Sequence, residues 1–309
     1  MLHNRDDFRD LLVTVGETTG AGAAIVEKDY WVTEALRAVA EHYDSAVVFK
    51  GGTSLSKAHR LISRFSEDID LLVRSEVGGR ARRDTLMKEI EGAVESIDGL
   101  ELIGGGRSER GISRTSVLQY RPVVESVVGL NPTVLLEMGI RGGPNPTTKV
   151  ALCSMLDDEL AKSENPDLAS ASFELTVLGP VRTFVEKLFA IHSACVLWRE
   201  GRQNALARQS RHLADLHALA GADPVKAFVG TDEYRNLVRE VSAIGAEWFP
   251  RDHRPPHELS FASSPALAPD KALRHALEAD YEQSRFLFYG DRPELSAVFS
   301  RLGELRPSL

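Results

Sequence analysis

The stretch Phe49–Val73, FKGGTSLSKAHRLISRFSEDIDLLV, holds two carboxylates at the start of an apolar run. The run from Asp68 onward has the pattern of a half-buried strand. Side chains alternate along a strand, so Asp68 and Asp70 face the same side, about 6–7 Å apart, while Ile69 enters the core. Two carboxylates at that separation can hold one or two hard cations such as Mg²⁺, with substrate phosphates as further ligands.

A Gly-Gly-Thr turn precedes these carboxylates. Gly51 and Gly52 end a short apolar strand, and we expect Thr53 to cap a helix that runs through Arg60. A helix N-terminus behind glycines can hold an anion, because the backbone N–H groups approach it closely. Alone, the Asp-x-Asp also fits a solvated strand entry, and the Gly-Gly-Thr fits an ordinary turn. Together they predict phosphoryl or nucleotidyl transfer, and the absence of G-x-x-x-x-G-K-[ST] excludes a P-loop.

Bulk properties are those of an ordinary globular protein. The 309 residues are 43% hydrophobic and 27% charged, which predicts two lobes with a sizeable core. No run is long enough to span a membrane, the charged N-terminus does not resemble a secretion signal, and two cysteines without ligand spacing favour a reducing cytoplasm. The net charge of −8 argues against a protein coated in nucleic acid, but it leaves room for a local basic groove.

The hydrophobic patterns predict an α+β fold with a mixed sheet in residues 1–155, followed by a mainly helical lobe in residues 156–309. Two helices are expected within residues 5–42 and another over the segment GRARRDTLMKEIEGAVESI, with strands at Thr115–Arg121 and Thr133–Ile140. A last strand is expected at Leu175–Leu178. The later helices are expected at Pro180–Glu200, Asn204–Ala220, Thr231–Ala243, Lys271–Tyr289 and Pro293–Leu302, with a long loop around residues 245–270.

At this point the sequence resembles a known family. GGTSLSKAHRLISRFSEDIDLLV is similar to the first motif of the DNA polymerase β-type nucleotidyltransferases, and more narrowly to that of the AbiEii/AbiGii-type toxins, which include the MenT toxins. Three further segments resemble motifs of the same toxins: EKDYWVTEALR at 27–37, RTFVEKLFAIH at 182–192 and RHLADLHAL at 211–219. The C-terminal third matches no motif.

The resemblance implies the toxin of a bacterial toxin–antitoxin pair. Such a protein would have a two-lobed nucleotidyltransferase fold, use an NTP with Mg²⁺ (Mn²⁺ being the alternative metal), and add nucleotides to the 3′ acceptor end of tRNA, which inhibits translation. The expected partners are the tRNA acceptor stem, the nucleoside triphosphate and a cognate antitoxin. A cytoplasmic monomer without a membrane segment is expected.

The resemblance also implies roles for individual residues. Asp68 and Asp70 would hold the metal, Gly52 and Thr53 would contact the nucleotide phosphates, and Thr53 stands where the wider superfamily has serine. Lys187 would bind the nucleotide phosphates and Asp215 would complete the pocket, so that Asp68, Asp70, Lys187 and Asp215 form the predicted catalytic set. The predicted nucleotide-binding set is Gly51, Gly52, Thr53, Lys57, Ser66, Glu137 and Arg141.

Three members of the nucleotide-binding set are assigned from their positions in the sequence. Glu137 lies in the apolar run TVLLEMGI, where an unpaired carboxylate is costly, so it is the candidate third carboxylate; the alternative is a strand edge facing solvent. Arg141 follows that strand and could pair with the triphosphate or with RNA. Ser66 lies two residues before Asp68 and points to the same side in an extended chain. Phosphorylation of Ser66, by an antitoxin that is a kinase, would add negative charge beside the metal ligands; the alternative is a hydroxyl that caps a local turn.

Arginines supply the candidate contacts to RNA. Arg208, Arg211, His212 and Asp215 fall at i, i+3, i+4 and i+7, so they are predicted on one helix face. The other arginines of interest in the first lobe are Arg80, Arg82, Arg83, Arg107, Arg110, Arg114 and Arg121. The alternatives to transfer onto tRNA are transfer to a protein or small-molecule hydroxyl, and a catalytically silent nucleotide-binding module.

Overall fold

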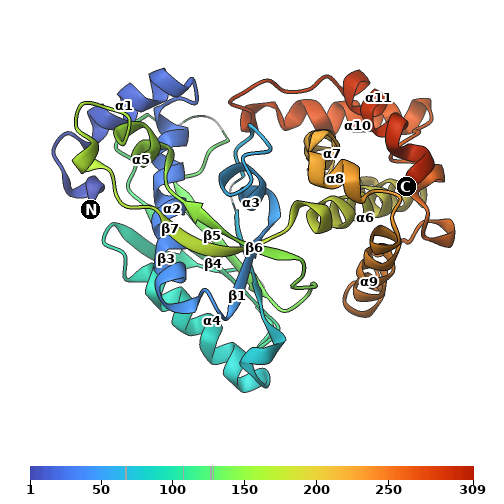
Figure 1. The fold of residues 1–309 in the computed structure, drawn as a ribbon, viewed down its shortest axis with the longest axis horizontal. Helices are drawn as coiled ribbons and strands as arrows, with labels where there is room; N and C mark the ends of the chain where they lie inside the picture. The colour runs from blue at the N-terminus through green and yellow to red at the C-terminus, as the bar shows by residue number, and fades with distance from the viewer. Residues whose placement is uncertain (67, 107, 126, 128) are drawn as a thin grey trace. The chain divides into compact units, whose positions relative to one another are not determined.

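The computed structural model describes every residue except 67, 107, 126 and 128, and the chain divides into two compact units. Unit 1 comprises Met1–Ala58 and Phe65–Leu178, and unit 2 comprises His59–Arg64 and Gly179–Leu309 (Figure 1). The chain therefore enters unit 2 for one short segment just before the two aspartates and then returns to unit 1.

A seven-stranded mixed sheet forms the centre of unit 1, with the strand order β3-β4-β5-β2-β1-β7-β6. The strands are β1 (Val47–Lys50), β2 (Asp68–Val73), β3 (Leu100–Gly104), β4 (Ser113–Tyr120), β5 (Thr133–Gly139), β6 (Thr147–Leu152) and β7 (Phe173–Leu178). Strand β2 runs antiparallel to β1 and parallel to β5, so it lies in the middle of the sheet. Its central position protects it on both edges and fixes where its side chains project.

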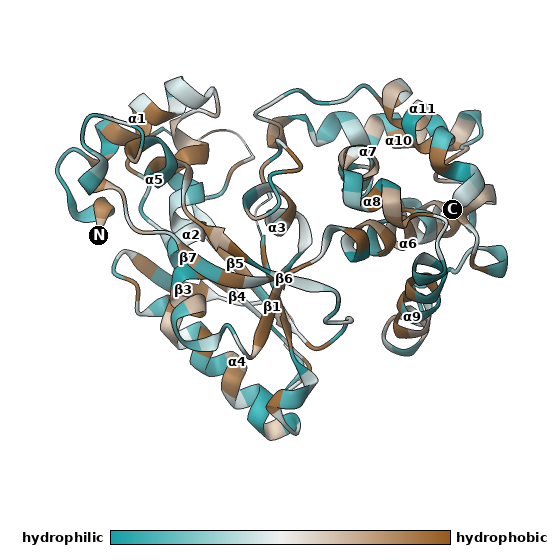
Figure 2. Ribbon diagram, viewed as in Figure 1, coloured by the Kyte–Doolittle hydropathy of each residue, from teal (hydrophilic) through white to brown (hydrophobic). Residues whose placement is uncertain are grey.

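Five helices accompany this sheet: α1 (Phe8–Thr19), α2 (Ala23–Tyr43), α3 (Gly51–Lys57), α4 (Arg80–Glu95) and α5 (Met155–Leu160). Helix α2 contacts β5, β7 and α4, and it buries Trp31 and Leu36. Helix α4 lays its apolar stripe on β3 and β4 and leaves its charged side exposed, which is the amphipathic pattern visible in Figure 2.

Unit 2 is helical, with α6 (Pro180–Arg199), α7 (Arg211–Gly221), α8 (Asp223–Phe228), α9 (Asp232–Trp248), α10 (Lys271–Gln283) and α11 (Leu295–Leu305). Helix α6 is its core element: it contacts α7, α8 and α9, and most of its residues are buried. The segment between α9 and α10 carries only short 3₁₀ turns, as the sequence predicts. None of the helices in the described parts of the chain is long and apolar enough to cross a membrane.

The predicted α+β fold is confirmed, but three details differ. The division of the chain does not fall at residue 155, because β7 returns to pair with β1 through Phe49 and Val177, so unit 1 continues to Leu178. Helix α3 ends at Lys57 rather than Arg60. Thr53 does not cap α3; Lys50 holds the N-cap position, and Thr53 is a buried residue inside the helix.

Candidate active site

The two aspartates of β2 lie on one face of the sheet in unit 1. Asp68 and Asp70 are half-buried, while Ile69 between them is fully buried on the opposite face. Asp70 is the register partner of Glu137 on β5, so Glu137 projects to the same face. Glu137 is an exposed residue. The alternation expected from the sequence thus places three carboxylates on one face of two adjacent strands.

The β1–α3 turn brings backbone against Asp70. Gly51 has a φ of +79°, which is the left-handed region that glycine adopts at little cost. A Cβ atom on Gly51 would lie 1.9 Å from Asp70 Oδ2. Gly52 follows as a buried residue of α3. Glycine is therefore required at position 51 both by its conformation and by the neighbouring carboxylate.

Thr53 holds the entry to β2. Its hydroxyl donates to the carbonyl oxygen of Asp68 at 2.5 Å and lies 3.3 Å from that of Ser66. Its side chain is 4% exposed. The hydroxyl thus fixes the backbone from which Asp68 projects, and a direct contact between this hydroxyl and a nucleotide phosphate gains no support from the geometry.

The donor set on this face suits a hard cation. Asp68, Asp70 and Glu137 offer carboxylate oxygens, and Mg²⁺ commonly takes one or two carboxylates and completes its shell with water and substrate phosphates. In the parts of the chain that the structure describes, no group of three or more His, Cys, Asp and Glu side chains converges as a metal site. Asp68 and Asp70 remain the predicted metal ligands, with Glu137 as a neighbour on the same face.

Two other residues predicted to bind the nucleotide contact acidic side chains elsewhere in unit 1. The Lys57 ammonium lies 2.7 Å from Asp29 and 2.6 Å from the Thr33 hydroxyl, so it joins α3 to α2. Arg141 pairs with Glu109 at 2.5 Å. These contacts give Lys57 and Arg141 structural roles, and their binding of the nucleotide stays a prediction.

Ser66 is 6% exposed, and its carbonyl oxygen faces Thr53. A kinase could reach its hydroxyl only if the segment around it opened.

Lys187 and Asp215 meet inside unit 2, in a cluster with Arg64. Asp215 is fully buried and receives two hydrogen bonds from Arg64, from Nε to Oδ1 and from Nη2 to Oδ2, each 2.6 Å long. The Lys187 ammonium lies 2.7 Å from the same Oδ2 and 3.2 Å from His212 Nδ1. One carboxylate therefore serves two cations, and this fork-to-carboxylate geometry fixes its orientation.

The charges in this cluster follow from burial. Burial alone would raise the pKa of Asp215, but Arg64 and Lys187 hold that pKa well below its usual range. Burial lowers the pKa of Lys187, against the opposing attraction of Asp215. Burial and the charge of Lys187 lower the pKa of His212 to about 4, so His212 is neutral at pH 7. The neutral His212 accepts a hydrogen bond from Lys187 through Nδ1.

Sequence reasoning missed Arg64 and Lys50. Arg64 is 2% exposed and meets a partner 151 positions away, a separation at which spacing carries no signal. Lys50 is the last residue of β1 and the register partner of Asp70 on the neighbouring strand β2, which places a cation beside the carboxylate. Its adjacency to Gly51 was the available signal.

The predicted helix face at residues 208–215 is partly wrong. Helix α7 begins at Arg211, and Arg208 lies before it with a φ of +61°. Its backbone N–H donates to Asp280 at 2.7 Å. Arg107, proposed among the arginines of the first lobe, lies outside the described residues.

Comparison with known proteins gives a family and a similar solved structure. Residues 34–301 match the model of the nucleotidyl transferase AbiEii toxin of type IV toxin–antitoxin systems. The structure is similar to MenT4, the nucleotidyltransferase toxin Rv2826c from Mycobacterium tuberculosis H37Rv, with a TM-score of 0.55 and 17% sequence identity over 96% of this chain and 99% of that one. No curated protein matches.

Proposed function

Because the chain belongs to the AbiEii nucleotidyl transferase toxin family, we propose that it transfers a nucleotide from an NTP to the 3′ end of tRNA and thereby inhibits translation. The observation that carries this proposal is the face of β2, where Asp68 and Asp70 project side by side beside the Gly51 turn. Proteins of this family are toxins of toxin–antitoxin pairs. The paired carboxylates suit a metal that neutralises phosphate charge during nucleotide transfer.

In the proposed reaction the RNA 3′-hydroxyl gives its proton to solvent, and its oxygen forms a bond to the α-phosphorus of the NTP. The bond from that phosphorus to the bridging oxygen breaks, and pyrophosphate leaves. Asp68 and Asp70 would hold Mg²⁺, which when bound neutralises charge on the phosphates and activates the attacking oxygen. Glu137 adds negative charge on the same face, and Lys50 of β1 is the register partner of Asp70.

Lys187 would bind the triphosphate, with Asp215 and Arg64 as its support. Asp215 fixes the ammonium through a hydrogen bond, and the bidentate contact with Arg64 fixes Asp215. A bound phosphate would give the Lys187 ammonium a second anion, beside the Asp215 carboxylate that Lys187 shares with Arg64. We assign Lys187 to phosphate binding and Arg64 to positioning.

The test is incubation with each NTP, labelled at the α-phosphate, with Mg²⁺ and total tRNA, followed by sequencing of the RNA 3′ ends. Added nucleotides at tRNA 3′ ends support the proposal. Label found on protein or on a small molecule would replace tRNA by one of the alternative acceptors. Absence of label on any acceptor, with NTP still bound, would support the non-catalytic module.

We also propose that the cognate antitoxin controls the site at Ser66. A phosphate there would add about −1.5 to −2 charges two residues before Asp68 and compete for the metal or the nucleotide site. Ser66→Asp is expected to mimic the silenced state, and Ser66→Ala to stay active but resist the antitoxin. Normal neutralisation of Ser66→Ala, with no phosphate detected by mass spectrometry, would remove this mode of control.

A further inference from the structure

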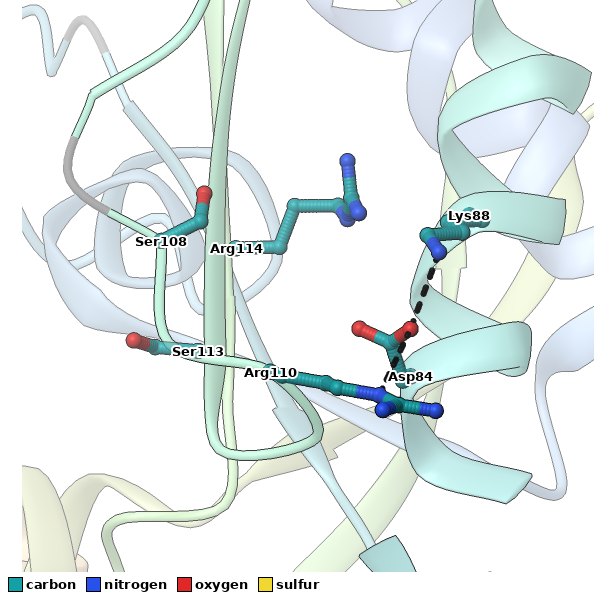
Figure 3. A pocket seen from close by; sticks show the side chains of 6 residues that line it. All are labelled: Asp84, Lys88, Ser108, Arg110, Ser113 and Arg114. Atoms are coloured by element: carbon teal, nitrogen blue, oxygen red, sulfur yellow. Dashed lines mark ion pairs between the residues drawn. The ribbon is translucent and has the colours of Figure 1, made fainter. Parts of the chain in front are cut away.

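A cationic pocket lies between helix α4 and the start of β4 in unit 1. We call it the α4 pocket; its volume is about 320 Å³, and it is lined by Asp84, Lys88, Ser108, Arg110, Ser113 and Arg114. Figure 3 shows Arg110 reaching from the loop toward Asp84, which points out of α4 beside Lys88, while Arg114 extends from β4 toward the same helix. Lys88 and Arg110 thus pair with one carboxylate, while the hydroxyls of Ser108 and Ser113 line another part of the pocket and point away from Asp84.

The carboxylate lies deeper than the cations it pairs with. Asp84 is 12% exposed, and it contacts Lys88 at 2.9 Å and Arg110 at 3.8 Å, whose side chains are 59% and 74% exposed. Exposed ion pairs of this kind contribute only about 0–1 kcal/mol, so the cations can turn to another anion at low cost. Arg114 is more firmly held, by Glu91 of α4 at 3.0 Å.

Two arginine side chains of α4 hydrogen-bond to the backbone of the loop that carries Arg110. Arg80 Nε donates to the Arg110 carbonyl at 2.7 Å, and Arg83 Nε donates to the Gly111 carbonyl at 3.1 Å. Gly111 has a φ of +63°, and a Cβ on it would lie 2.2 Å from the Arg80 carbonyl oxygen. The loop therefore packs tightly on the helix. Because the backbone that carries Arg110 is already ordered, binding a ligand costs less conformational entropy.

A second pocket adjoins the first. It has a volume of about 460 Å³ and is lined by Arg80, Ala81 and Arg110, so the Arg110 side chain borders both. Guanidinium, ammonium and hydroxyl donors are the groups that contact phosphates in nucleic-acid complexes. Two neighbouring hollows with a shared arginine suit successive phosphates of a polymer better than a single phosphate ion.

This surface is on the other side of the sheet from the aspartates. Thr115 is the register partner of Glu137, so Arg114 and Ser116, one position to either side, project to the opposite face. Both contact Glu91 of α4 there. The α4 pocket therefore cannot touch the reacting phosphate, and it would hold a part of a long substrate remote from its 3′ end.

We propose that the α4 pocket and the adjoining pocket bind the phosphate backbone of the RNA substrate. The inference rests on the proposed RNA acceptor, because it assigns that substrate a second contact. The surface is a local cationic region on a chain with a net charge of −8, so its attraction for RNA depends on this distribution and is sensitive to salt.

The first experiment removes two of the exposed cations. In Lys88→Ser/Arg110→Ser, total tRNA should bind at least about tenfold more weakly, and the slope of log K against log [salt] should become shallower by about one to two. The KM for tRNA should rise, while kcat and the affinity for NTP stay within about twofold.

The matched control is Arg9→Ser/Lys226→Ser, which removes the same charge from two exposed side chains whose acidic neighbours lie 3.9 and 3.8 Å away. It should leave tRNA affinity within about twofold. An equal loss in both double variants would show a general charge effect and overturn the inference.

A second variant separates binding from structure. Asp84→Asn removes the carboxylate that competes with phosphate, so tRNA affinity should increase about threefold. A loss of affinity instead would make the cluster structural and overturn the inference.

The failures of the two proposals are distinguishable. If the unaltered protein modifies tRNA but Lys88→Ser/Arg110→Ser binds and modifies it equally well, only the inference fails. If the unaltered protein neither binds nor modifies tRNA, the proposed acceptor fails and the inference fails with it.

Discussion

Asp70 of unit 1 and Asp215 of unit 2 are both predicted catalytic residues, but their surroundings differ. Asp70 projects from β2 on a face that is half open to solvent, against the backbone of Gly51. Asp215 is fully buried between Arg64 and Lys187. Removal of the first should change the chemistry, and removal of the second should also change the stability.

We expect Asp70→Asn to abolish nucleotide transfer and growth inhibition without lowering Tm. The substitution keeps the shape of the side chain but removes the charge that a metal requires, and the relief of repulsion from Asp68 and Glu137 offsets the lost attraction of Lys50. Label transfer to tRNA and thermal unfolding measure the two effects. Transfer at the rate of the unaltered protein would exclude Asp70 from the site.

Asp215→Ala, by contrast, should lower the free energy of unfolding by about 3–5 kcal/mol, because two buried cations lose the carboxylate they share. Urea unfolding followed by circular dichroism gives this value. The double variant Arg64→Met/Asp215→Ala is the control: it removes a charge of each sign, so part of the lost stability should return. A single variant as stable as the unaltered protein would contradict the buried cluster.

At the scale of elements, the β1–α3 turn couples backbone conformation to the aspartates. Gly51→Ala should reduce transfer by at least tenfold and also lower Tm, because its φ of +79° costs alanine about 1–2 kcal/mol and the new Cβ displaces Asp70. Activity and Tm are measured together.

Gly92→Ala is the matched control, since a Cβ there meets nothing within 4 Å in the middle of α4. It should leave transfer unchanged and raise stability by about 1 kcal/mol. If the two glycine variants behaved alike, the close approach of Gly51 to Asp70 would not matter.

Local sequence patterns predicted the helices and strands in which buried residues recur at regular spacing. Helices α2 and α6, strand β2 and the shared face of its aspartates could be read from spacing, because each depends on residues near in the chain. Strands β3 and β6 were missed. They are the two edges of the sheet, and most of their side chains are exposed or half-exposed, so neither carries an apolar run.

Long-range pairing explains the rest. The parallel contact of β7 with β1 and the contact of Arg64 with Asp215 join segments more than a hundred residues apart, and neither leaves a local signature. Lys57 was assigned to the nucleotide because of its position after the glycine turn, whereas tertiary packing pairs it with Asp29. The motif located the candidate site, but the partners of its charged residues came only from the fold.

At the scale of the whole molecule, buried histidines make stability depend on pH. His192 donates to or accepts from Ser264 at 2.7 Å, and its burial, with a smaller effect of His253, lowers its pKa to about 4. The pKa of His212 is also lowered to about 4. Both residues belong to unit 2.

The sign follows from proton binding. Between about pH 6.5, the ordinary histidine pKa, and about pH 4, the unfolded chain binds protons that the folded chain does not. The free energy of unfolding should therefore have its full value above about pH 6.5. It should fall as the pH is lowered to about 4, by at most about 3 kcal/mol for each histidine. The lowered pKa of Asp215 adds a further loss only below about pH 4, where the unfolded carboxyl is protonated.

Urea unfolding at pH 7 and pH 4.5 measures this dependence, at low protein concentration because the isoelectric point is about 5.7. His192→Gln should reduce the difference between the two pH values, since glutamine keeps a polar contact with Ser264 but does not titrate. His275→Gln is the control, because His275 is an exposed residue of α10, and it should leave the difference unchanged. Equal stability of the unaltered protein at both pH values would contradict the lowered pKa of His192 and His212.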